Sequence, residues 1–156
     1  MFVVETRQIP EQQLASIERR VLVGDLPQFI NDAMSIIYDA LAQSGEVTGI
    51  PFVVYHGEVN TDSDGPVEAC VPYVGELNPS GEIRLRLEPA HSEAFTRITK
   101  TQVAFPGILE AYEAVENWIV EQGLPAAGPP REVYFTDWEA AGDDDPACDI
   151  AFPIET

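Results

Sequence analysis

The segment LPQFINDAMSIIYDALAQSG, residues 26–45, is the strongest structural signal in this chain because its apolar side chains recur every three or four positions. This spacing places them on a single stripe of an α-helix. The stripe consists of Leu26, Phe29, Ile30, Ala33, Ile37 and Leu41. Asp25 is placed to cap the helix, Pro27 fits its first turn, and Gly45 fits its C-terminal end.

A second helix is predicted over FPGILEAYEAVENWIVEQG, residues 105–123. Its apolar stripe consists of Phe105, Ile108, Tyr112, Val115 and Ile119. Pro106 fits the first turn and Gly123 the C-terminal end, as Pro27 and Gly45 do in the first helix.

The two helices belong to an internal repeat. Residues of the first half correspond to residues of the second half at one constant sequence separation, called the first offset below, along most of the chain. The pairs that it relates are Pro10 and Pro89, Ala15 and Ala94, Pro27 and Pro106, and Tyr55 and Tyr134. The segment PFVVYHG corresponds to REVYFTD at the same offset, and EACVPY corresponds to DIAFPI at a slightly longer second offset, which takes Pro72 to Pro153. We therefore predict one domain over residues 1–156, built from a repeat of about 1–76 and a repeat of about 81–156.

Each half reads as an extended segment, a proline, a second strand, the helix, and two further strands. The acidic loops NTDSDGP and DWEAAGDDDP, rich in glycine and proline, separate those last two strands. The prediction is an α+β fold of two βαββ repeats related by a pseudo-twofold axis. Its antiparallel sheet and two long helices are expected to leave a central ligand cleft between the halves.

The strongly negative charge of the chain limits the classes of molecule that it can bind. Its 27 acidic and 8 basic residues give a net charge of −19, while 45% of the residues are apolar and suffice for a core. Such a field repels nucleic acid and anionic membranes and attracts cationic ligands or basic proteins, or it serves only as a solvated surface. The start MFVVETRQIP lacks the apolar centre of a signal peptide, so we expect a cytoplasmic protein.

The sequence offers few ligands for a metal or a cofactor. Cys70 and Cys148 lack the spacing of zinc ligands, and His56 and His91 are each solitary. No serine or cysteine triad can be assembled from these residues. We expect neither a metal site nor a cofactor.

Glu132 stands out in PPREVYFTDW, residues 129–138. Val133, Tyr134 and Phe135 favour a strand, and the proline pair marks its beginning. Residues two apart share one face of a strand, which places the Glu132 carboxylate beside the Tyr134 ring. Desolvation in such surroundings raises the pKa of a carboxyl unless a cation or a hydrogen-bond donor compensates.

The order of elements and several motifs resemble the GyrI-like (gyrase-inhibitor-like) small-molecule-binding family over nearly the whole chain. The matching features are LP before the first helix, the segment GPPREVY at residues 128–134, and four positions of the second helix. These four are Ala111, Tyr112, Trp118 and Gly123. The family includes effector domains of bacterial multidrug transcription regulators, gyrase-inhibitory proteins, and hydrolases of cyclopropane-bearing cytotoxins.

The resemblance implies a pair of βαββ units around a ligand cleft, with Glu132 as the acidic residue that meets the ligand. Val53 occupies the corresponding place in the first half. Where the family often has Gly-Pro-Tyr before the second helix, this chain has Val103, Ala104 and Phe105, so a drier pocket is expected. We expect a free-standing module without a helix-turn-helix segment ahead of the effector unit.

Three functions remain open at this point. The first is binding of hydrophobic, cationic small molecules, with aromatic ring faces around the acid. The expected ligand-binding residues are Glu132, Tyr134, Tyr55, Phe105, Tyr112, Trp118 and Val53. The second is hydrolysis of strained electrophiles with Glu132 as general base, its catalytic residue. The third is inhibition of a basic protein partner by the acidic surface, with no direct binding to nucleic acid or membrane.

Overall fold

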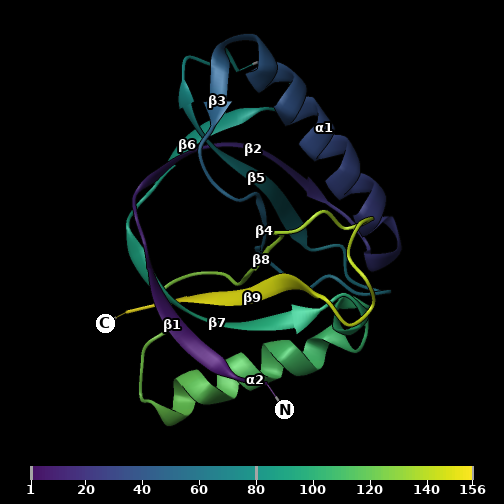
Figure 1. Cartoon of the computed structure of the whole chain (residues 1–156), viewed down its shortest axis with the longest axis vertical. Coiled ribbons are helices and arrows are strands. Elements are labelled where there is room, and N and C mark those ends of the chain that lie inside the picture. Colours follow the sequence, from purple (N-terminus) through teal and green to yellow (C-terminus); the bar gives the residue numbers. More distant parts are fainter. Residues whose placement is uncertain (1, 80, 156) are drawn as a thin grey trace. The chain divides into compact units, whose positions relative to one another are not determined.

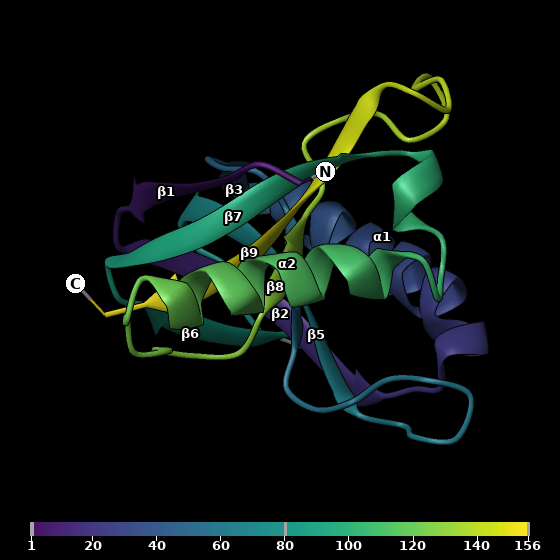
Figure 2. The ribbon, with the colours of Figure 1, turned by 90° about the horizontal axis from the view of Figure 1, so that it is seen from below.

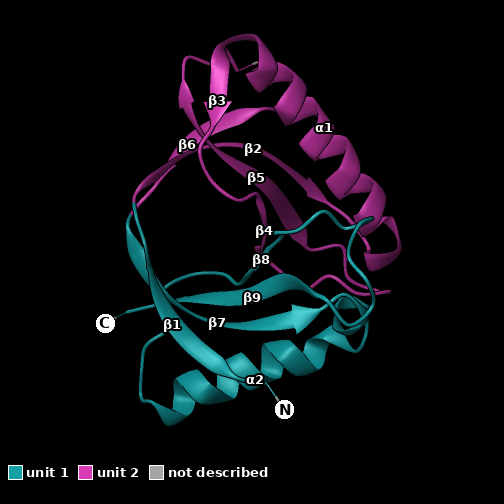
Figure 3. Ribbon diagram, in the orientation of Figure 1, with its two compact units in different colours: residues 1–10, 90–156 teal, residues 11–89 magenta. Residues whose placement is uncertain are grey.

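The chain divides into two units, which Figure 3 distinguishes by colour. The computed structural model describes residues 2–79 and 81–155. Unit 1 combines Met1–Pro10 with Ala90–Thr156, and unit 2 is Glu11–Pro89. The combination of sheet and helix in each unit confirms the predicted α+β class.

Unit 1 contains an antiparallel run of four strands backed by one long helix (Figure 1). In spatial order the strands are β1 (Val4–Ile9), β7 (His91–Thr99), β9 (Pro146–Ile154) and β8 (Arg131–Val133). The helices are α2 (Ile108–Glu121) and the short 3-10 turn η2 (Thr101–Val103). Figures 1 and 2 both show α2 running along β7 and β9.

The interface between α2 and these strands forms the apolar core of unit 1. The helix contributes Ile108, Ala111, Val115 and Ile119, and β7 contributes Ala94 and Ile98. Strand β9 contributes Cys148, Ile150, Phe152 and Ile154. The buried positions lie at steps of three and four residues, and three of them, Ile108, Val115 and Ile119, belong to the predicted stripe. Ala111 is buried in addition, whereas Tyr112 is only partly buried and Phe105 lies before the helix.

Unit 2 has the same kind of construction. In spatial order its strands are β4 (Phe52–Tyr55), β5 (Pro66–Gly75), β2 (Gln12–Arg20) and β6 (Arg84–Glu88), with β3 (Gly45–Val47) paired to the far end of β5. The helices are η1 (Val23–Asp25) and α1 (Leu26–Ser44), and α1 packs against β2 and β5.

Strand registers in the two units correspond under the offsets found in the sequence. Ala15 pairs with Val71 in unit 2, and Ala94 pairs with Phe152 in unit 1. The first offset therefore relates β2 to β7, and the second offset relates β5 to β9. Each residue pair between the two central strands of one unit therefore corresponds to a pair between the two central strands of the other unit.

The first strand of each half of the sequence pairs with a strand from the other half. Strand β1, from the N-terminal half, pairs with β7 in unit 1, and β6 pairs with β2 in unit 2. The units are therefore not the contiguous segments 1–76 and 81–156, and that division stays a prediction about sequence repeats. Pro10 and Pro89 lie at the two changes from one unit to the other.

Helix α1 buries Phe29, Ala33, Ile37 and Leu41, which confirms most of its predicted stripe. Asp25 occupies the N-cap position of α1, as predicted. Its backbone angles are helical at the end of η1, however, and its side chain makes no capping hydrogen bond.

The start of α2 also differs from the prediction, because Pro106 precedes the helix instead of lying in its first turn. The 3-10 turn η2 ends at Val103, and the ψ of 132° at the next residue, Ala104, is extended, so the chain leaves helical geometry before α2 begins at Ile108. The Phe105–Pro106 peptide bond in this connection is cis. At the other end, Gly123 adopts a φ of +69°, a conformation that favours glycine after a helix.

The packing of α1 predicts unequal effects for two adjacent isoleucines. Ile37→Val should lower the free energy of unfolding by ~0.5–1.5 kcal/mol, because Ile37 is fully buried and the lost methyl group leaves a small cavity. Ile36→Val removes the same group from a side chain that is 43% exposed and should cost less than ~0.5 kcal/mol. Urea denaturation measures both values, and equal losses would contradict this assignment of the helix face.

None of the helices within residues 2–79 and 81–155 is long and apolar enough to span a membrane.

Candidate ligand-binding site

Glu132 lies in β8, where it pairs with Ile150 of β9, and its side chain is turned toward the face that α2 covers. Only 5% of the residue is exposed. The strand is shorter than predicted: it ends at Val133, so Tyr134 and Phe135 follow it in irregular backbone. The pairing of β8 with β9 covers Arg131, Glu132 and Val133.

Two tyrosine hydroxyls hold the Glu132 carboxylate. The Tyr112 hydroxyl, from α2, donates a hydrogen bond to Oε2 at 2.6 Å. The Tyr134 hydroxyl donates to the other oxygen, Oε1. The Tyr112 ring also meets the Phe152 ring edge-on, with 5.9 Å between the centroids. The acid is therefore oriented from both sides and bordered by aromatic rings.

Cys148, in β9, is excluded as a nucleophile at this site. Burial raises the pKa of its thiol well above the ordinary value, and the negative charges of Glu132 and Asp149 raise the pKa further. The thiol therefore stays protonated, and a protonated thiol is a weak nucleophile.

The structure brings three of the predicted ligand-binding residues together, namely Glu132, Tyr112 and Tyr134. Trp118 packs half-buried against the apolar core of unit 1. Phe105 lies before α2 and is 39% exposed. A ligand role for these two side chains stays a prediction.

The other two predicted residues belong to unit 2. Val53 is fully buried in β4 opposite Ala69 of β5, and Tyr55 is half-buried at the end of β4. Their role toward a ligand, and the predicted cleft between the halves, stay predictions.

Sequence analysis missed two clusters of buried charge. Asp149 of β9 is 1% exposed and accepts hydrogen bonds from Arg7 and Arg97. Glu68 of β5 is 5% exposed and contacts Arg86 and His56. The available signal was an acidic residue inside an otherwise apolar strand, in CDIAFPI and in VEACVPY.

Glu68 is strongly stabilised in its charged form. Burial by itself raises the pKa of Glu68, but hydrogen bonds from Arg86 and His56 outweigh that effect and lower the pKa from 4.5 to about 2. The Arg86 guanidinium contributes two of them, from Nε at 2.8 Å and from Nη2 at 3.0 Å. Burial lowers the pKa of Arg86, and its bonds to Glu68 more than restore it.

The two units, each an antiparallel run of strands with one long helix, define an α+β domain. Unit 1 holds a buried glutamate that is hydrogen-bonded to two tyrosines. The family model of the GyrI-like small molecule binding domain matches residues 3–155. The chain therefore belongs to the GyrI-like small-molecule-binding family, and small-molecule binding is its general function.

Solved structures show the same fold. The C-terminal domain of EcmrR has a TM-score of 0.85 and 19% identity, with 100% of this chain and 99% of that chain covered. EcmrR in a complex with DNA has a TM-score of 0.83 and 20% identity, with 99% of this chain covered. This chain spans 58% of that longer EcmrR chain.

A third similar structure is SAV2435 bound to tetraphenylphosphonium, with a TM-score of 0.63 and 14% identity. The alignment covers 98% of this chain and 94% of that chain. At these identities the likenesses concern the fold. No curated protein matches the sequence.

Proposed function

We propose that this protein binds lipophilic organic cations, with Glu132 as the acidic recognition residue and Tyr112 and Tyr134 as its aromatic and hydrogen-bonding partners. One observation carries the proposal: a carboxylate that is 5% exposed receives a tyrosine hydroxyl on each oxygen. Hydrogen bonds of this kind favour the charged form of a carboxylate. They also hold it in place before a ligand arrives.

The surroundings of the acid favour a particular kind of cation. A small inorganic ion is strongly hydrated and would lose that hydration among aromatic rings. An organic cation with apolar substituents loses little hydration and gains cation–π contacts worth ~0.5–2 kcal/mol each. The rings of Tyr112, Tyr134 and Phe152 supply such surfaces beside the acid.

We propose that the site opens at Tyr134. This residue follows the last residue of β8, outside the register of β8 with β9, and its ring packs half-buried against the core of unit 1. Tyr112, in contrast, is held on α2 against Phe152. We expect Tyr134 to move on ligand entry and Tyr112 to stay.

A ligand pair of similar shape and different charge tests the proposal. Tetraphenylphosphonium is the cation that the SAV2435 structure contains, and triphenylphosphine oxide is a smaller neutral relative. Because a ligand that binds only the folded state stabilises it, the cation should raise the melting temperature in a concentration-dependent way. The neutral compound should raise it much less at the same concentration. Equal shifts, or none with a wider panel of organic cations, would contradict charge recognition.

Hydrolysis is a second candidate because of the same two hydroxyls. A glutamate that acts as general base benefits from a proton donor nearby. This chain has Phe105 where the family often has a tyrosine, and the hydroxyls of Tyr112 and Tyr134 supply the missing donor. Turnover of an electrophilic substrate separates this function from binding alone. The inhibition of a basic partner through the acidic surface stays a prediction from the net charge of −19.

A further inference from the structure

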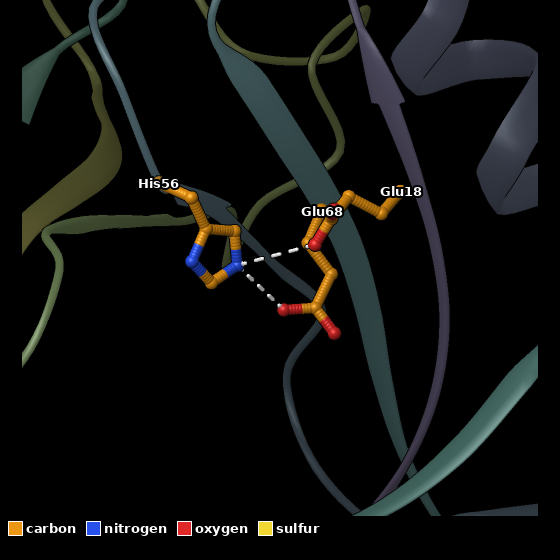
Figure 4. A group of neighbouring side chains, drawn as sticks. All are labelled: Glu18, His56 and Glu68. Atoms are coloured by element: carbon orange, nitrogen blue, oxygen red, sulfur yellow. Dashed lines mark hydrogen bonds and ion pairs between the residues drawn. The ribbon is translucent and has the colours of Figure 1, made fainter.

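Unit 2 places two carboxylates directly opposite each other on neighbouring strands. Glu18 of β2 pairs with Glu68 of β5 in the antiparallel register. Like charges at such positions destabilise a sheet unless a cation lies between them. His56, just after β4, turns one ring nitrogen toward both acids, as Figure 4 shows.

The three side chains have a compact arrangement. His56 Nε2 lies 3.0 Å from Glu68 Oε1 and 3.7 Å from Glu18 Oε1. One ligand atom from each residue falls within 4.8 Å of the others. The side chains of Glu18 and His56 are 36% and 33% exposed, and that of Glu68 is 6% exposed, so the group can be reached from solvent on one side.

The equivalent place in unit 1 holds a cation. The first offset takes Glu18 to Arg97, and the second offset takes Glu68 to Asp149. Arg97 and Asp149 pair in the β7–β9 register, and the guanidinium donates to the carboxylate at 2.8 Å and 3.0 Å. The same cross-strand position is therefore acid against base in unit 1 and acid against acid in unit 2.

The histidine position changes in a matching way. The first offset takes His56 to Phe135, and the Arg97 guanidinium carbon lies 4.3 Å from the centre of the Phe135 ring. The fourth member of the group is an arginine in both units, because the same offset takes Arg7 to Arg86. Where unit 1 has the Arg97 guanidinium over the Phe135 ring, unit 2 has the Glu18 carboxylate beside the His56 imidazole.

The charges of the two groups differ by two units. Without the imidazoles, Glu18, Glu68 and Glu88 against Arg86 leave −2 in unit 2, whereas Asp149 and Glu93 against Arg7 and Arg97 leave 0 in unit 1. The group in unit 2 therefore lacks two positive charges relative to the group in unit 1. A divalent cation at the Glu18–Glu68 pair would restore the balance that unit 1 achieves with arginine.

We propose that unit 2 binds one divalent transition-metal ion of the zinc type through His56 Nε2 and one carboxylate oxygen each of Glu18 and Glu68. Bonds of ~2.0–2.2 Å in tetrahedral geometry place ligand atoms about 3.3 Å apart. The separations of 3.0 Å and 3.7 Å lie on either side of that value. Imidazole nitrogen with carboxylate oxygen is a donor set that zinc and its neighbours accept.

Arg86 orients the buried ligand. Its Nε donates to Glu68 Oε2 at 2.8 Å and its Nη2 donates to Oε1 at 3.0 Å, which fixes the carboxylate with Oε1 also facing His56. Support of a ligating carboxylate by a further hydrogen bond is common at metal sites. The expectation of no metal from the sequence counted only nitrogen and sulfur ligands, whereas two of the three ligands proposed here are carboxylates.

Calorimetric titration of the whole protein with zinc chloride tests the site after dialysis against a chelator and then into 150 mM salt. We expect one zinc ion per chain. Glu18→Gln and His56→Gln should each raise the Kd at least about tenfold. His91→Gln is the matched control: His91 Nε2 lies 3.2 Å from Glu93, which is already held by Arg7 at 2.8 Å, so zinc binding should not change.

A double replacement copies the arrangement of unit 1 into unit 2. Glu18→Arg with His56→Phe should abolish stoichiometric zinc binding and, in chelator, raise the melting temperature above that of the unaltered protein. The proposal is overturned if zinc binds the Gln variants as tightly as the unaltered protein, or if magnesium binds with the same affinity. Either result would indicate diffuse attraction to an acidic surface, an adventitious ion only. Absence of a single stoichiometric zinc site would equally overturn it.

Discussion

Replacing Glu132 with glutamine is expected to weaken binding of tetraphenylphosphonium at least about 30-fold. Loss of one partner of a buried charge pair costs ~2 kcal/mol or more, and each 1.4 kcal/mol is a factor of ten in affinity. Glutamine keeps the shape of the side chain and an oxygen that can accept a tyrosine hydroxyl. Binding of a neutral ligand of similar shape should fall less than about threefold. Calorimetry or fluorescence competition gives both values.

The control for Glu132→Gln is Glu110→Gln. Glu110 lies in the first turn of α2 and is exposed, so this change removes one negative charge from the protein without touching the site. If both variants lose cation affinity equally, the general field of the protein attracts the ligand, and Glu132 does not recognise it. If the unaltered protein turns over an electrophilic substrate and Glu132→Gln does not, the hydrolase function is supported.

Replacing Arg86 with methionine is expected to lower the free energy of unfolding by about 2–4 kcal/mol at pH 7 in chelator. Removal of one partner from a wholly buried ion pair costs ~3–5 kcal/mol, and the 36% exposure of the Arg86 side chain reduces that figure. The cost arises because the Glu68 carboxylate stays buried without its guanidinium. Urea denaturation measures the difference.

The effect of Arg86→Met should depend on pH in a defined direction. The pKa of Glu68 is held at about 2, below the ~4.3 of an unfolded glutamate, so its interactions stabilise the protein above that unfolded value. This contribution is lost as the pH falls through the folded pKa. The difference between the two proteins should therefore be largest near neutrality and shrink from about pH 5 toward pH 2.

Arg19→Met is the matched control for Arg86. Arg19 pairs with Glu82, and both side chains are largely exposed, at 40% and 47%. Exposed pairs contribute ~0–1 kcal/mol because water already solvates both charges. A loss for Arg19→Met equal to that for Arg86→Met would show that burial of Glu68 is not the cause.

Local patterns predicted the helices and the α+β class because helical packing depends on residues three and four positions apart. Phe29, Ala33, Ile37 and Leu41 are buried as that spacing requires. Helix ends were predicted less well. Pro106 precedes α2, and Asp25, at the N-cap position of α1, makes no capping hydrogen bond, because the 3-10 turns before both helices depend on backbone geometry that side-chain spacing does not report.

The candidate site was predicted in part. Alternation along a strand put Glu132 and Tyr134 on one side, and their hydrogen bond agrees with this. The contact with Tyr112 required knowledge of how α2 crosses β9, and helical spacing alone made Tyr112 equally suited to the core. Family resemblance supplied the importance of Glu132, which periodicity by itself left open.

By itself the sequence determined two amphipathic helices, the two offsets that relate its halves, and one acid placed among aromatic residues, since all three are patterns readable along the chain. Only the tertiary structure decided that β1 and β6 pair away from their own halves, that Tyr112 reaches Glu132, and that Glu18 faces Glu68. The reason is physical: strand register and helix crossing join residues far apart in the chain, and their geometry depends on both partners at once.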